Sequence, residues 1–173
     1  MSTKRTADFT DKDFRLAFGR FATGVAIVTT TNPDTGKPVG LTVSSFNSVS
    51  LEPPLVLWCL RLASYNLPVF KNARHYNIHI LANDQIDLAM QFSTAKVPDR
   101  FADIDWEMSE TNTPLLSAKY CAAIFECASE QQHPAGDHLI MVGYVERCEH
   151  TNKLPLVFHA GTFDLTPTSR FAK

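Results

Sequence analysis

The chain consists mainly of short runs of apolar and β-branched residues that are separated by turn-forming residues. About six or seven of these runs suit β-strands, whereas helical patterns are few and short. A doubly wound α/β fold needs strands that alternate with helices of roughly 10 to 15 residues, and the sequence has no such alternation. It also lacks a G-x-G-x-x-G motif after a strand, which argues against a Rossmann site. The pattern therefore predicts a mainly β protein with short helices, folded as a closed or partly closed antiparallel barrel.

The predicted strands are spread over the whole chain. Residues 25–31 are mostly β-branched, and the turn-rich segment 32–38 is expected to close a hairpin onto a strand at 39–50. Residues 55–60 are uniformly apolar, which is typical of a strand buried on both faces, whereas 76–81 alternates as a half-buried strand does. Further strands are expected at 120–128, 139–149, 154–158 and 162–165.

Helical patterns occupy three short segments. The first, 10–24, is amphipathic, because an apolar stripe is formed by Phe14, Phe18 and Phe21. Thr10 or Asp11 can cap its start, and Gly24 can end it. Shorter helices are expected at 64–72 and 85–92.

The stretch 93–114 is polar and irregular, with aromatic residues at Phe101 and Trp106. A connection of this length in a compact domain is usually functional or forms a lid.

Composition limits the class of protein. Hydrophobic residues make up 45% of the chain and charged residues 20%, which predicts one globular domain over 1–173. The net charge of −2 and the scattered basic residues give no sign of a nucleic-acid or anionic-membrane partner. With no signal peptide and no apolar run near the roughly 20 residues of a membrane span, we expect a cytoplasmic protein. Its four cysteines form no C-x-x-C pair, which favours reduced thiols.

The first candidate for a binding site is the segment 40–50. It follows the pattern of a strand but is rich in small polar side chains, namely Thr42, Ser44, Ser45, Asn47, Ser48 and Ser50. Small side chains let a planar ligand lie against the backbone and bond to its N–H and C=O groups. An edge strand with one solvated, hydroxyl-rich face would give the same pattern, so both interpretations remain open.

The second candidate combines Arg61 with Ser64 and, further along, Lys71. An arginine beside a serine that opens a helix suits a phosphate, because helix N-termini present free N–H groups. The alternative is a surface arginine next to an ordinary helix cap.

The third candidate is the turn Gly136-Asp137-His138, which leads into an apolar strand. A histidine at the start of a strand, beside an aspartate, can bind a polar ligand or transfer protons. An exposed histidine in an ordinary turn would look the same. The nearby His133 also raises a metal site, although the spacing is not that of a known metal motif. A Cys–His nucleophile is a further alternative, but no cysteine lies in an evidently electropositive loop.

Four segments in this order resemble one family. They are FATGVAIVTT at 21–30, GLTVSSF at 40–46, VSLEPPLV at 49–56, and GDH at 136–138 followed by Gly143. Together they are similar to the flavin-reductase-like FMN-binding split-barrel family, the short-chain flavin reductases that serve two-component flavin-dependent monooxygenases. The resemblance runs from about residue 14 to 165, which implies that the core of the domain lies within these bounds. The segment HAGTF at 159–163 departs from the Gly-x-Tyr ending of that family, which leaves its contact with the ligand open.

The resemblance implies a homodimeric antiparallel split β-barrel with the flavin near the subunit interface. It implies that the isoalloxazine ring lies against Thr42, Val43, Ser44, Ser45 and Phe46. Arg61 and Ser64 would lie near the ribityl phosphate, and a covering block would comprise Phe92, Arg100 and Phe101. The turn with Gly136 and Asp137 would lie beside the nicotinamide, with His138 as the catalytic-site residue that positions the dinucleotide.

The implied activity is that of an NAD(P)H:flavin oxidoreductase, with NADH favoured over NADPH. Hydride would pass from nicotinamide C4 to N5 of FMN or FAD, and reduced flavin would diffuse to a partner monooxygenase. Two alternatives remain: an FMN oxidase similar to pyridoxamine-phosphate oxidase, and a flavin- or haem-binding module without turnover.

Overall fold

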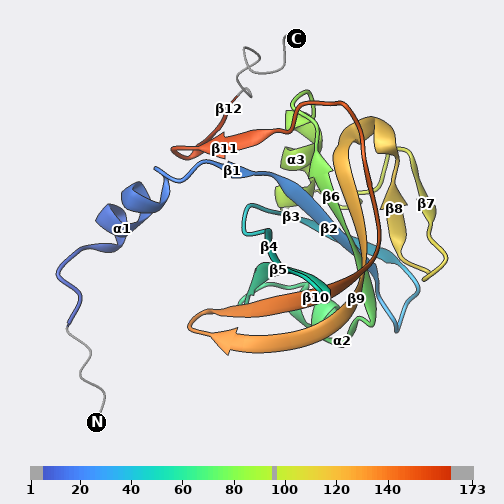
Figure 1. Cartoon of the computed structure of the whole chain (residues 1–173), viewed down its shortest axis with the longest axis horizontal. Helices are drawn as coiled ribbons and strands as arrows, with labels where there is room; N and C mark the ends of the chain where they lie inside the picture. The colour runs from blue at the N-terminus through green and yellow to red at the C-terminus, as the bar shows by residue number, and fades with distance from the viewer. Residues whose placement is uncertain (1–5, 95–96, 165–173) are drawn as a thin grey trace.

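A seven-stranded antiparallel sheet forms the body of the protein (Figure 1). The computed structural model describes residues 6–94 and 97–164. The strand order is β3-β2-β6-β9-β10-β5-β4. The strands are β2 (Ala26–Thr31), β3 (Pro38–Val43), β4 (Asn47–Leu51), β5 (Pro54–Arg61), β6 (His75–Leu81), β9 (Cys121–Ala135) and β10 (His138–His150). The mainly β, antiparallel architecture with short helices is therefore confirmed.

Smaller elements surround this sheet. A three-stranded sheet joins β1 (Thr23–Gly24), β11 (Val157–His159) and β12 (Thr162–Asp164), and a hairpin joins β7 (Trp106–Met108) to β8 (Pro114–Leu116). The helices are α1 (Asp11–Phe18), α2 (Leu67–Asn72), α3 (Ile86–Ser93) and the short 3-10 helix η1 (Ala118–Tyr120). The strand expected at 154–158 lies instead at β11, and Leu165, the predicted end of the last strand, lies outside the described residues.

The sheet curls so that its two edges meet. Strands β3 and β4 lie at opposite ends of the strand order, yet only residues 44–46 connect them. Four residue steps from Val43 to Asn47 span at most about 14 Å, so the edges must approach each other there. The single strand expected at 39–50 is therefore wrong, because the chain leaves one edge at 44–46 and starts the other.

The burial expected for two strands is reversed. In β6, Tyr76, Asn77, Ile78 and His79 are all fully buried, because the β7–β8 hairpin covers the second face of this strand. In β5 the side chains alternate between buried and partly exposed. The uniformly apolar segment 55–60 therefore forms a strand with only one buried face, and its other face is partly exposed.

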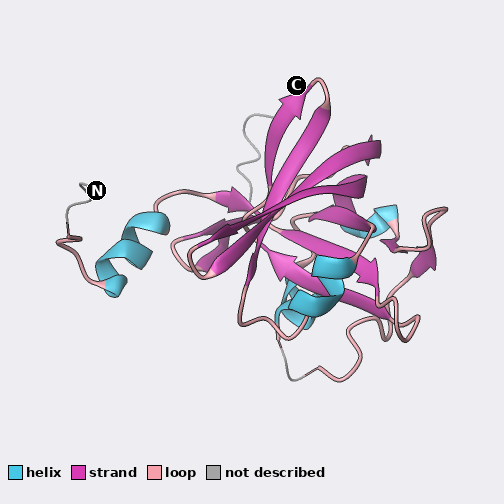
Figure 2. Ribbon diagram, turned by 90° about the horizontal axis from the view of Figure 1, so that it is seen from below, coloured by secondary structure: helices cyan, strands magenta, loops and turns pink. Residues whose placement is uncertain are grey.

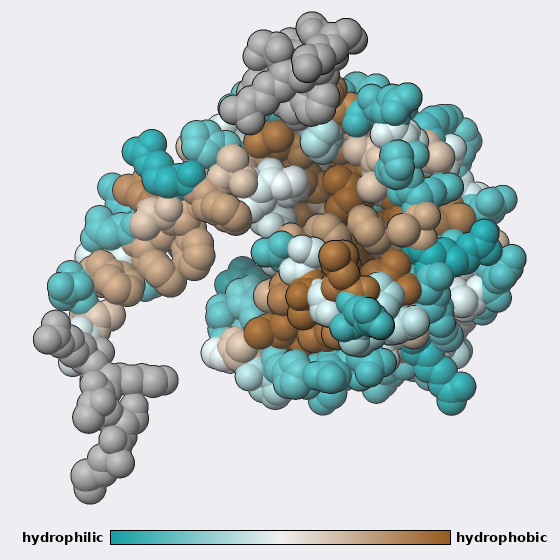
Figure 3. All heavy atoms as spheres, viewed as in Figure 1, coloured by the Kyte–Doolittle hydropathy of each residue, from teal (hydrophilic) through white to brown (hydrophobic). Residues whose placement is uncertain are grey.

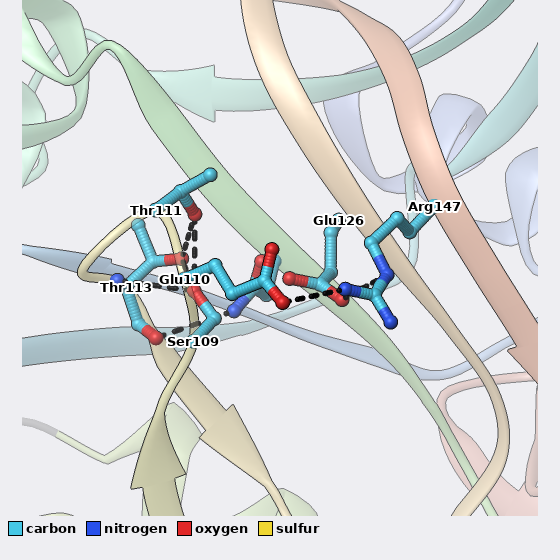
Figure 4. Close-up of polar contacts among 7 residues, drawn as sticks. Ser109, Glu110, Thr111, Thr113, Glu126 and Arg147 are labelled. Atoms are coloured by element: carbon cyan, nitrogen blue, oxygen red, sulfur yellow. Dashed lines mark hydrogen bonds and ion pairs between the residues drawn. The ribbon is translucent and has the colours of Figure 1, made fainter.

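The turn of the β7–β8 hairpin is held by polar contacts (Figure 4). The hydroxyls of Ser109, Thr111 and Thr113 lie 2.8–3.0 Å from one another. Arg147 on β10 pairs with Glu110 of the turn at 3.2 Å and with Glu126 on β9 at 3.6 Å. These contacts attach the hairpin to the sheet, although the sequence pattern predicted an irregular structure for 93–114.

Helix α1 stands apart from the sheet (Figures 2 and 3). Thr10 caps it with a capping box, as expected, but the helix ends at Phe18 and not at Gly24. The reason is that the chain turns at Gly19–Phe21 and enters β1 at Thr23. The apolar stripe is exposed along its whole length, and Phe18 has 64% of its surface accessible.

Candidate functional site

A cavity of about 640 Å³ opens where the chain passes from β3 toward β4. Its walls come from the end of β3, the end of β5 with the loop that follows, the end of α3, and the start of β10. Nine of the predicted site residues line it: Thr42, Val43, Ser44, Ser45, Arg61, Ser64, Phe92, Arg100 and His138. The fold therefore brings all three candidate segments into one place.

The hydroxyl groups of the first segment serve the fold. Thr42 Oγ1 donates to the carbonyl of Ala89 on α3 at 2.7 Å. Ser45 Oγ accepts from the N–H of Cys59 on β5 at 2.9 Å, which ties the 44–46 connection to the opposite edge of the barrel. Because the pairing of β3 ends at Val43 and that of β4 begins at Asn47, the backbone of 44–46 lies outside both ladders. These peptide groups, more than the hydroxyls, are placed to bond a ligand.

The turn between β9 and β10 places His138 at the wall of the cavity. Gly136 adopts a positive φ of 61°, which glycine accepts without strain. His138 pairs across the ladder with Arg61, and the Asp137 carbonyl accepts from the N–H of Leu62 at 2.9 Å. His138 Nδ1 and Asp137 Oδ1 are 2.7 Å apart, and this hydrogen bond lowers the pKa of the aspartate. The bond fixes the imidazole ring through Nδ1 and leaves Nε2 for a ligand.

Arg100 is held at the junction of β3 and α3. Its guanidinium donates to the carbonyls of Gly40 at 2.7 Å and Thr94 at 3.0 Å, and burial lowers its pKa. No carboxylate of the described residues pairs with it. Because its hydrogen bonds within the described residues are to neutral carbonyls, this half-buried cation retains charge and donors for an anionic ligand.

Two predicted aromatic residues lie outside this cavity. Phe101 is 6% exposed and packs edge-on against Phe92 at 5.0 Å and Trp106 at 5.3 Å, so it supports the wall from behind. Phe46 packs against Phe125 and lines a neighbouring cavity of about 510 Å³ beside α1. Gly136 and Asp137 shape the turn and are not among the residues that line the 640 Å³ cavity.

Ser64 does not open a helix, as the sequence predicted it would. Helix α2 begins at Leu67, after Asn66, and Ser64 Oγ accepts from the N–H of Asn66 at 3.3 Å instead of capping the helix. The N–H groups of Ser64 and Leu67 donate to the carbonyls of Arg61 and Ser64, so that residues 61–67 form turns before the six-residue helix begins. Lys71 lies in the last turn of α2 and does not line the cavity.

The alternatives of a metal or a thiol nucleophile gain no support. Across residues 6–94 and 97–164, no three His, Cys, Asp or Glu side chains lie close enough together to hold a metal ion. His133 instead forms a hydrogen bond with Gln131 on its own strand. Cys59 lines the cavity and was missed, because 55–60 was expected to be buried on both faces. Burial raises the pKa of its thiol, which disfavours the thiolate that a nucleophile needs.

Comparison with known proteins gives a consistent result. Residues 18–166 match the model for the flavin reductase like domain. The chain is 43% identical over 152 residues to an FMN reductase (NADH), SmoA, of Agrobacterium fabrum, covering 88% of this chain and 84% of that protein. It is 40% identical over 152 residues to the reductase component of the flavin-dependent trigonelline monooxygenase of Acinetobacter baylyi, covering 88% of this chain.

The fold is also similar to solved structures. The NADH:FAD oxidoreductase SgcE6 of Streptomyces globisporus superposes with a TM-score of 0.81 at 29% identity, covering 95% of this chain and 94% of that one. The chain spans only 48% of the Acinetobacter component.

None of the helices in the described parts of the chain is both long and apolar enough to cross a bilayer.

Proposed function

Because the chain belongs to the flavin reductase like domain family, we propose that it is an NADH-dependent flavin reductase that supplies reduced FMN or FAD to a monooxygenase. The observation that carries this proposal is the single cavity that collects the 42–45 segment, two arginines and His138. Three segments that are distant in sequence converge there, as a ligand with chemically different parts requires.

The residues present fit a flavin. A volume of about 640 Å³ lies within the roughly 300–1,000 Å³ typical of cofactor sites. The free peptide groups of 44–46 supply donors and acceptors for the edge of a planar ring, and Arg61 and Arg100 supply positive charge for a phosphate. The bound flavin supplies the hydride acceptor, which the protein need not provide.

The proposed roles of the side chains follow from their positions. N–H groups of 44–46 would stabilise negative charge on the reduced ring, because fixed donors need no reorganisation. Arg100, Arg61 and Ser64 would hold the phosphate end. His138, fixed by Asp137, would position the nicotinamide dinucleotide within reach of the isoalloxazine ring. Holding two reactants close together in the right orientation accounts for much of the rate enhancement of such a reaction.

Further properties belong to the same proposal. We infer a cytoplasmic homodimer of the split-barrel type, with NADH preferred over NADPH. The exposed apolar stripe of α1 and the neighbouring cavity that α1 shares with Phe46 support a second subunit, because monomers rarely expose contiguous apolar surface.

The decisive test mixes purified protein with NADH and follows the loss of NADH absorbance with and without added flavin. Consumption of NADH that depends on flavin is expected. Tightly retained FMN with oxygen consumption and no nicotinamide requirement would instead support an oxidase similar to pyridoxamine-phosphate oxidase. Flavin binding without any turnover would support a binding module.

A further inference from the structure

The side-chain amide of Gln91, near the end of α3, holds the main chain that carries Arg100. Its Nε2 donates to the carbonyl of Arg100 at 2.9 Å and to the carbonyl of Ala102 at 3.1 Å. A glutamine amide has two N–H hydrogens and no charge, so it can make both bonds at once. Gln91 itself does not line the 640 Å³ cavity. Any effect of Gln91 on a ligand there must therefore pass through the segment that it holds.

The two hydrogen bonds of Gln91 lie on either side of Phe101. The ring of Phe101 is buried and packs edge-on against Phe92, which fixes how deep the segment lies in the fold. Apolar contacts are not directional, whereas hydrogen bonds to the flanking carbonyls restrict the orientation of the peptide planes. Gln91 therefore sets the direction in which the main chain presents the side chain of Arg100.

Asp99 is the carboxylate nearest to Arg100 in the sequence. Its Oδ1 accepts from the N–H of Phe101 at 2.9 Å, and within the described part of the chain it forms no ion pair with Arg100. Both residues line a neighbouring cavity of about 940 Å³, but only Arg100 also lines the 640 Å³ cavity. The guanidinium donates to the carbonyls of Gly40 and Thr94. Its positive charge is therefore not neutralised by an ion pair at the proposed flavin site.

We propose that Gln91 is a positioning residue, which holds Arg100 in the orientation that binds the phosphate of the flavin. Gln91 fixes the main chain of Arg100, and the carbonyls of Gly40 and Thr94 fix its guanidinium. An arginine that is held in place before binding loses less conformational freedom when the ligand arrives. This inference rests on the proposed function, because it takes the 640 Å³ cavity as a flavin site with the phosphate beside Arg100.

The test compares the dissociation constants of FMN and riboflavin, which has the same ring and ribityl chain but no phosphate. Quenching of flavin fluorescence measures both. Gln91→Met keeps an unbranched, uncharged side chain and removes both N–H donors, and Gln91→Ala is a second variant without them. Gln132→Met is the matched control. The amide of Gln132 also donates to a main-chain carbonyl, that of Lys71 at 2.9 Å, but Gln132 lines neither cavity.

Both Gln91 variants should weaken FMN binding about fivefold, the factor that one ordinary hydrogen bond is worth, and leave riboflavin binding unchanged. Arg100→Gln should weaken FMN binding about tenfold, because a charged hydrogen bond is lost, again without an effect on riboflavin. In chains that already carry Arg100→Gln, Gln91→Met should have no further effect, since the two residues act on the phosphate as one unit. Gln132→Met should change neither constant.

Three results overturn the inference. Equal weakening of FMN and riboflavin in the Gln91 variants would show that Gln91 only stabilises the fold. An undiminished effect of Gln91→Met in the absence of Arg100 would show that it does not act through the arginine. Unchanged FMN binding in Arg100→Gln would remove the arginine from the phosphate. In each case flavin-dependent NADH consumption by the wild-type protein would leave the proposed function standing, while its absence with both FMN and FAD would refute that function.

Discussion

His79 should make the stability of this protein strongly dependent on pH. The side chain is fully buried between β2, β6 and β8. Its Nδ1 lies 3.1 Å from the carbonyl of Ile27, and its Nε2 accepts from the N–H of Leu116 at 3.1 Å. Only the neutral ring can donate at one nitrogen and accept at the other. Burial accordingly lowers the pKa of His79 to about 4.

The magnitude follows from the difference between folded and unfolded states. An unfolded histidine has a pKa of about 6.5, so the unfolded chain binds a proton first as the pH falls. The stabilisation by His79 is thus fully present above pH 6.5 and is lost progressively down to pH 4. The full loss corresponds to about 3 kcal/mol, of which about 2 kcal/mol is already lost at pH 5.

Urea unfolding at pH 7.5 and at pH 5.0 measures this loss, at one fixed protein concentration. His79→Gln keeps a donor and an acceptor without a titrating ring, so its free energy of unfolding should fall about 2 kcal/mol less than that of the wild type. His133→Gln, at an exposed histidine, serves as the control. If the variant proves too unstable, NMR of the wild-type ring should show no protonation of His79 down to pH 5. Equal pH dependence of wild type and His79→Gln, or a ring that titrates near 6.5, would refute the argument.

Two further substitutions test the site. His138→Ala should raise the KM for NADH much more than it weakens flavin binding, because the ring is proposed to hold the dinucleotide; steady-state kinetics with a separate flavin titration measures both, and an unchanged KM would remove His138 from the site. Gly40→Ala should destabilise the fold by roughly 1–3 kcal/mol in urea unfolding, since the new methyl would lie 2.6 Å from a ring carbon of the buried Phe92. Phe92→Leu in the same chain should recover part of that loss, and no loss in Gly40→Ala alone would show that the wall is looser than the structure indicates.

The sequence predicted the elements better than their edges. Local residue preferences can be recognised in a single sequence. They were enough to predict the helix cap at Thr10, the hairpin at 32–38 and the strands β2, β5 and β6. The break at 44–46 was missed because it depends on which strands lie at the two edges of the sheet, and no local pattern encodes that order.

Burial was hardest to predict where a distant segment supplies the cover. Asn77 and His79 alternate with apolar residues and so suggested a solvated face. The β7–β8 hairpin instead covers them, accepting a hydrogen bond from Asn77 Nδ2 and donating one to His79 Nε2. For the site, the residues predicted from the sequence include nine of the fifteen that line the cavity, five of them in the 40–46 and 136–138 segments. Cys59 was missed, because it belongs to no motif and its strand was expected to be buried on both faces.

The three-residue link between β3 and β4 also has a thermodynamic consequence. A ligand bonded to the peptide groups of 44–46 would lie where the two edge strands β3 and β4 are not hydrogen-bonded to each other. Its hydrogen bonds would link these two edges. Saturation at about 100 times the dissociation constant is worth roughly 2.7 kcal/mol of stability. That gain should appear as slower amide hydrogen exchange in both β3 and β4, because the bound cofactor would stabilise both edges of the sheet that forms its site.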